Sequence, residues 1–181
     1  MTEISFFTGT LVILAAWLLT RTVCCLKAGA VGWKQEAKQL LFLINLIVVL
    51  RFTFYPFFKV NGQIQPLVFD PATAWPFRIN WIPFVNILDY ESSLKDILIN
   101  IPGNIAMFLP TGILLPLIYQ NMDSPKKVVL TGAAISLGIE ILQLPFSSRV
   151  SDIDDLILNT TGCLLGYGIL ALIRRIRKKQ T

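Results

Sequence analysis

The segment RVSDIDDLILNTTG (residues 149–162) places carboxylate and amide side chains at the start of an apolar stretch. Asp152, Asp155 and Asn159 follow the spacing i, i+3 and i+7, which puts them on one stripe of a helix. Asp154 lies off that stripe, so we expect it to face solvent or lipid headgroups. Aspartate also compensates the helix dipole at a helix start, so Asp152 or Asp155 can serve partly as a cap.

Side chains of these types can do three kinds of chemistry. They can bind a polar headgroup, hold a hard cation such as Mg²⁺ or Ca²⁺, or act as a general acid or base when a carboxyl group is buried. The sequence shows no metal-ligand loop spacing, and it has no histidine, which argues against a zinc site or a Ser-His-Asp triad. We therefore predict no metal and no cofactor and assign no catalytic residue, while cation binding by the acidic cluster stays open.

Polar side chains from four apolar stretches are predicted to lie at the same depth in the membrane. Arg51, Asn104, Glu140 and Asn159 each fall roughly 10 Å from the same surface, at about 1.5 Å per helical residue. Buried ionisable groups usually face the bundle interior or water. One interpretation is an Arg51–Glu140 ion pair that fixes helix packing, and the other is a water-accessible pocket. The candidate pocket residues are Arg51, Asn104, Glu140, Gln143, Arg149, Asp152, Asp155 and Asn159.

The composition indicates that lipid is the main solvent of these elements. Of the 181 residues, 54% are hydrophobic and 15% are charged, well below the charged fraction of soluble domains. Five stretches are long enough to cross a bilayer as helices, so we predict an all-α, polytopic membrane helix bundle. The expected spans are about 4–26, 39–58, 97–119, 128–146 and 153–173. Gly162 and Gly166 form a GxxxG pair for close helix packing, and Ala134 and Gly138 are spaced likewise.

The distribution of charge predicts the orientation of these spans. Lys and Arg gather in the first and third loops and in the C-terminal tail, whereas acidic residues predominate in the second loop (59–96) and before the fifth span. Because cytoplasmic loops are enriched in Lys and Arg, we expect the N-terminus outside and the C-terminus in the cytoplasm. The basic tail then faces anionic lipid rather than nucleic acid. Prolines and aromatic residues, Trp75 and Trp81 among them, predict that the second loop lies on the outer leaflet.

Several motifs together resemble the VanZ-like family of bacterial membrane proteins. They are NIPGNIAMFLPTGILLPLI (100–118), GIEILQL (138–144) and RVSDIDDLILNTTGCLLGYGI (149–169), with INWIPF (79–84) before the third span. The resemblance covers about residues 40–175. It divides the chain into an N-terminal span and cytoplasmic loop (1–38), a VanZ-like membrane domain (39–175) and a basic cytoplasmic tail (176–181). The matching positions are Asn104, Phe108, Pro110, Gly112, Glu140, Gln143, Arg149, Asp152, Asp155 and Asn159.

The resemblance implies a role in the bacterial cell membrane, at the outer face of the envelope. The name-giving member is associated with resistance to the glycopeptide teicoplanin, which binds envelope precursors. We therefore expect modulation of glycopeptide susceptibility, with the lipid bilayer and a lipid-linked envelope precursor or the glycopeptide target as partners. Three alternatives stay open: a membrane-embedded enzyme acting on such a precursor, a small transporter or channel, and a structural or partner-binding protein.

Overall fold

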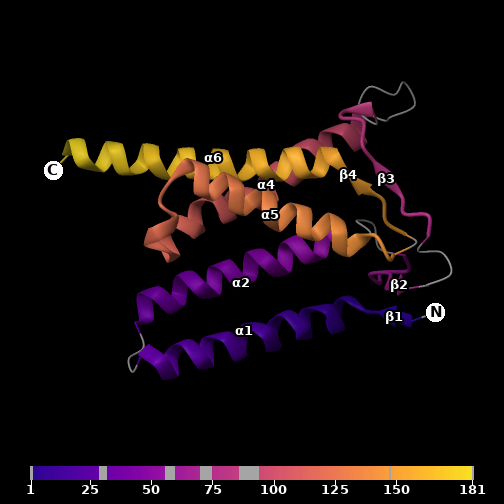
Figure 1. Ribbon diagram of the computed structural model, residues 1–181, viewed down its shortest axis with the longest axis horizontal. Helices are drawn as coiled ribbons and strands as arrows, with labels where there is room; N and C mark the ends of the chain where they lie inside the picture. The colour runs from indigo at the N-terminus through magenta and orange to yellow at the C-terminus, as the bar shows by residue number, and fades with distance from the viewer. Residues whose placement is uncertain are drawn as a thin grey trace. The chain divides into compact units, whose positions relative to one another are not determined.

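The computed structural model describes residues 2–28, 32–55, 60–69, 75–85, 94–146 and 148–180. Most of these residues are helical (Figure 1), in α1 (Phe6–Ala28), α2 (Trp33–Phe54), α4 (Leu94–Ile118), α5 (Pro125–Gln143) and α6 (Ile153–Gln180). The remaining elements are short, namely β1 (Thr2–Ile4), β2 (Leu67–Phe69), β3 (Ile79–Asn80), η1 (Gln120–Met122) and β4 (Ser151–Asp152). The predicted all-α class is therefore confirmed.

Four described helices are long and apolar enough to cross a membrane. They are Phe6–Lys27, Trp33–Phe54, Ile99–Ile118 and Ile153–Gln180. They agree with the first, second, third and fifth predicted spans, so the chain is a multi-pass membrane protein. The fourth predicted span corresponds to α5, which has 19 residues and carries Lys126, Lys127 and Glu140. Whether α5 crosses the membrane stays a prediction, as does the orientation of the termini.

Three helix ends differ from the predicted spans by four residues or more. One is the start of α2, which lies at Trp33 and not near residue 39. The second span was expected to reach residue 58, but α2 ends at Phe54 and Tyr55 is extended, with φ −106° and ψ 144°. The prediction was wrong because proline at position 56 disfavours the helical conformation of the residue before it. At the other end of the chain, α6 continues through Gln180, so the basic residues of the tail extend a helix.

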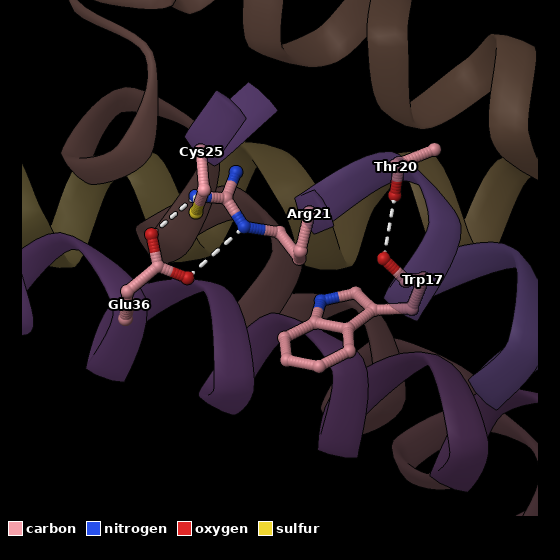
Figure 2. Close-up of polar contacts among 5 residues, drawn as sticks. All are labelled: Trp17, Thr20, Arg21, Cys25 and Glu36. Atoms are coloured by element: carbon pink, nitrogen blue, oxygen red, sulfur yellow. Dashed lines mark hydrogen bonds and ion pairs between the residues drawn. The ribbon is translucent and has the colours of Figure 1, made fainter. Parts of the chain in front are cut away.

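The described chain divides into two compact units. One comprises Met1–Arg78 with Gln143–Arg149, and the other Ile79–Leu142 with Val150–Thr181. In the first unit, α1 and α2 form a hairpin whose turn lies outside the described residues (Figure 1). Near that turn, Arg21 of α1 reaches both carboxylate oxygens of Glu36 on α2, as Figure 2 shows. This bidentate ion pair joins the two helices side chain to side chain.

At the other end of the hairpin, Tyr55 joins the end of α2 to the start of α1. Its ring is 1% exposed and packs edge-on against Phe6, with ring centroids 5.4 Å apart. Its hydroxyl donates to the Ser5 carbonyl oxygen at 3.0 Å. Next to this contact, β1 pairs antiparallel with β2, Glu3 opposite Val68. The second loop is therefore tied back to the residues that precede α1.

The second unit is built on close packing of α4 and α6, with α5 beside them (Figure 1). Gly112 of α4 and Gly162 and Gly166 of α6 lie so close to the opposite backbone that an added Cβ would overlap it. The predicted GxxxG face is therefore confirmed. Gly138 was expected to play a similar part, but a Cβ there would meet none of the described atoms within 4 Å. That prediction was wrong because spacing alone does not show which face of a helix is covered.

The second loop contains more regular structure than its prolines predicted. In the second unit β3 pairs parallel with β4, with Ile79 opposite Ser151 and Asn80 opposite Asp152. The side chains of Trp75 and Trp81 are 74% and 70% exposed, and their placement in the headgroup zone stays a prediction. Several acidic residues of this loop, Asp70, Asp89 and Glu91, lie outside the described residues.

Candidate functional site

Asp152 organises the start of α6. It precedes the first helical residue, and its Oδ1 accepts the Asp154 backbone N–H at 2.9 Å, which is the geometry of an N-cap. The Asn80 side-chain amide also donates to both Asp152 carboxylate oxygens, at 3.2 Å each. The short β3–β4 pair holds Asn80 and Asp152 opposite each other. Asp152 is therefore a cap, as expected, and also the anchor of the INWIPF segment.

Asp155 and Asn104 join α6 to α4. The Asn104 Nδ2 donates to Asp155 Oδ1 at 2.6 Å, a short charge-assisted hydrogen bond. The bond lies at the end of the α4–α6 contact that is nearest Asp152. The two residues were both predicted as members of the candidate pocket, and the structure brings them into direct contact.

Glu140 and Asn159 add two buried side chains to this end of the second unit. The Glu140 Oε2 accepts the Asp152 backbone N–H at 2.9 Å, and the Asn159 Nδ2 donates to Ser136 Oγ at 3.0 Å. Glu140 is 4% exposed and Asn159 is fully buried. Among the described residues, Asn159 Oδ1 has no hydrogen-bond partner, and Glu140 Oε1 has none in regular hydrogen-bond geometry, although the Ser151 hydroxyl lies near the Glu140 carboxylate. Such an unsatisfied buried acceptor costs about 1–3 kcal/mol.

The five pocket residues of the second unit lie at the same end of that unit, and this set is defined here as the acidic cluster. It contains Asn104, Glu140, Asp152, Asp155 and Asn159. Three of these residues are carboxylates, and Asp152 and Asp155 both lie close enough to repel the Glu140 carboxylate. The described basic side chains of this unit belong to Lys126, Lys127 and the last turns of α6, at the opposite end. The cluster thus favours hydrogen-bond donors and positive charge over anions.

The other three predicted residues lie in the first unit, where they share a different task. Gln143 Nε2 donates to the Thr53 carbonyl oxygen at 2.6 Å. Arg149 Nε donates to the Phe54 carbonyl oxygen at 2.7 Å. Arg51 Nη1 donates to the Tyr55 carbonyl oxygen at 3.3 Å. These carbonyls end α2, where the helix leaves acceptors without internal partners. Cationic donors also compensate the negative end of the helix dipole. The predicted Arg51–Glu140 ion pair joins residues of different units and stays a prediction.

Asp154 is not on the exposed side of α6. It is 5% exposed, and its Oδ1 accepts the backbone N–H of Phe84 at 2.7 Å. The expectation that Asp154 faces solvent or headgroups was therefore wrong. Helical phase correctly separated it from Asp155, but it took no account of the loop residue that covers the other side of the helix start. Phe84 itself has φ +60°, an unfavourable conformation for a bulky residue.

Replacement of Asp154 by alanine should release this loop. The variant loses a charge-assisted hydrogen bond and leaves Phe84 in a strained conformation without its partner, so we expect a loss of about 1–3 kcal/mol of local stability. Limited proteolysis with chymotrypsin measures the effect as faster cleavage after Phe84. Phe84→Gly in the Asp154→Ala background should recover stability, because glycine accepts positive φ. Since this variant lacks the cleavage site at position 84, its midpoint of thermal unfolding is compared with that of Asp154→Ala. An unchanged cleavage rate in Asp154→Ala would contradict this role.

Sequence reasoning did not assign three residues that contact the acidic cluster or the neighbouring Asp154. Asn80 and Phe84 lie in the INWIPF segment, which signalled a motif without showing that it folds against the start of α6. Ser136 shares a helical stripe with Glu140, one turn away, which was the available signal for its contact with Asn159. Among the described residues, no group of three or more Asp, Glu or Cys side chains is placed to hold a metal ion.

Comparison with known proteins agrees with this arrangement of motifs. The sequence profile described as VanZ/LLP1 matches residues 42–174, which include all residues of the acidic cluster and all three residues at the end of α2. No curated protein and no solved structure matches the chain. Since the matched region covers well over half of the sequence, the chain belongs to the VanZ/LLP1 family.

Proposed function

We propose that the acidic cluster binds a donor-rich polar group of a cell-envelope component, and that the protein thereby lowers susceptibility to glycopeptides such as teicoplanin. The observation that carries the proposal is the pair of buried acceptors, Glu140 Oε1 and Asn159 Oδ1, without partners in regular hydrogen-bond geometry among the described residues. A ligand donor that reaches either atom would remove a penalty of about 1–3 kcal/mol.

The charge of the cluster restricts the chemistry of the ligand. Glu140, Asp152 and Asp155 disfavour a phosphate and favour an ammonium, an amide N–H or a hydroxyl group. The sugar and peptide portions of a lipid-linked envelope precursor supply such donors, and glycopeptides act on the same precursors. Binding at this site would alter access of the drug to its target, with no bond broken.

The proposal places the acidic cluster at the outer face of the bacterial cell membrane. Lys126, Lys127 and the basic residues that end α6 lie at the opposite end of the second unit. The positive-inside rule supports a cytoplasmic position for that basic end, and hence an external position for the cluster. Envelope precursors are exposed to glycopeptides on that external side.

Glu140→Gln tests the proposal with little change of shape. The amide oxygen of glutamine can still accept the Asp152 N–H, whereas its NH₂ group replaces the unpartnered acceptor with a donor. We expect the wild-type chain, expressed in a teicoplanin-susceptible bacterium, to raise the minimum inhibitory concentration of teicoplanin. Glu140→Gln should return it to the level of the empty vector, with membrane insertion unchanged.

Glu3→Gln is the matched control, because it makes the same Glu-to-Gln change at an exposed position outside the acidic cluster. It should protect as well as the wild type. Protection that persists in Glu140→Gln would exclude the cluster as the site. A wild-type chain without effect on teicoplanin susceptibility would overturn the glycopeptide role itself.

A further inference from the structure

The last turns of α6 line an open groove at the basic end of the second unit. The groove has a volume of about 460 Å³. Its cationic walls are Arg174, Arg175, Lys178 and Lys179, its apolar part is formed by Tyr167 and Ala171, and Asp123 closes one side. Tyr167, Ala171, Arg174, Arg175 and Lys178 follow the spacing i, i+4, i+7, i+8 and i+11, so they share one helical face.

One wall of the groove is held in place by an ion pair. Arg174 Nη1 lies 2.8 Å from both carboxylate oxygens of Asp123, which follows η1. Asp123 neutralises one of the four cations, so a net positive charge remains in the groove. The side chains of Arg175, Lys178 and Lys179 are exposed. The charge of the groove therefore favours anionic ligands, whereas the acidic cluster at the other end of α6 disfavours them.

The length of α6 places this groove at a membrane surface. The helix has 28 residues and so spans about 42 Å, against about 30 Å for a hydrocarbon core. If the hydrocarbon begins near Ile153, it ends near Leu172, between the apolar and the basic parts of the groove. Tyr167 and Ala171 then lie at acyl-chain depth, and Arg174 to Lys179 lie among headgroups.

We propose that this groove is a binding site for an anionic phospholipid, with the phosphate on the Arg and Lys side chains and the first part of an acyl chain against Tyr167 and Ala171. Arginine and lysine clusters directly beyond a membrane helix attract anionic headgroups, by about 1 kcal/mol per residue near the surface. The order of apolar and basic lining along α6 matches the order of chain and headgroup in a lipid. The site is independent of the proposed glycopeptide role.

The test is native mass spectrometry of the full-length protein released from mixed phosphatidylglycerol and phosphatidylcholine micelles. Wild type should retain phosphatidylglycerol in preference to phosphatidylcholine. Arg175→Gln/Lys178→Gln should lower phosphatidylglycerol retention by about tenfold or more, given about fivefold per residue. Both positions are exposed, so folding should be unaffected and is checked by thermal stability.

Lys126→Gln/Lys127→Gln is the control, since it removes the same charge at the same end of the unit but outside the groove lining. It should keep preferential retention close to that of wild type. Equal loss in both double variants would show general electrostatic attraction and overturn the site. Equal competition by glycerol phosphate would exclude a contribution of the acyl chain, and groove-dependent binding of an oligonucleotide would assign the groove to nucleic acid instead.

Discussion

Gly166→Ala should destabilise the protein, whereas Gly138→Ala should leave its stability unchanged or raise it. An added Cβ at Gly166 overlaps the Leu109 carbonyl oxygen of α4 and crowds Gly112, so α4 and α6 must separate. Overpacking of this kind costs about 1–3 kcal/mol, which exceeds the gain of about 1 kcal/mol from better helix propensity. At Gly138 the Cβ meets none of the described atoms within 4 Å, so only the propensity gain remains.

The two alanine variants differ only in position, which makes the comparison direct. The midpoint of thermal unfolding in detergent, followed by size-exclusion chromatography, measures both. A lower midpoint for Gly166→Ala, with no decrease for Gly138→Ala, is the expected result. If both variants shifted the midpoint equally, backbone contact between α4 and α6 would not be the main stabilising interaction of the second unit.

Asp152→Ala should destabilise the protein at least as much as Gly166→Ala, because one carboxylate makes several contacts. The variant loses the cap on the Asp154 N–H and leaves the Asn80 amide without its acceptor. We expect a loss of about 2 kcal/mol or more from the lost cap and the unpaired, part-buried Asn80 amide together. Hydrogen exchange at the first turn of α6 should become faster.

Asp152→Asn distinguishes the contribution of the helix cap from that of the negative charge. Asparagine caps helices as well as aspartate does, so its Oδ1 can still accept the Asp154 N–H. This variant should therefore lose less stability than Asp152→Ala and keep slow exchange in the first turn of α6. Equal destabilisation by the two substitutions would show that the negative charge, and not the cap, is what matters at this position.

Apolar length and small-residue spacing predicted the helices and their closest contact well. Four of the five expected spans are helices of sufficient length, and Gly162 and Gly166 pack against α4 as their spacing indicated. Both signals are local and repeat along the chain with the helical period. They need no knowledge of distant residues.

The candidate site could be predicted in its residues but not in its contacts. Asp152 and Asn80 are far apart in the sequence and meet through two-residue strands, which leave no periodic pattern. Asp154 is buried by a loop backbone, which a helical projection of α6 cannot include. Gln143 and Arg149 lie beside Glu140 and Asp152 in the sequence, yet they cap α2 in the first unit.

The helix α6, which the glycine contact joins to α4, also has a fixed apolar length. Between Asp155 and Arg174, α6 carries about 18 residues without a charge, which corresponds to about 27 Å. An α-helix keeps its rise of about 1.5 Å per residue, so in a thicker or thinner bilayer the helix pair must tilt or the lipid must deform around it. The tilt of the α4–α6 pair should therefore depend on the acyl-chain length of the surrounding lipid.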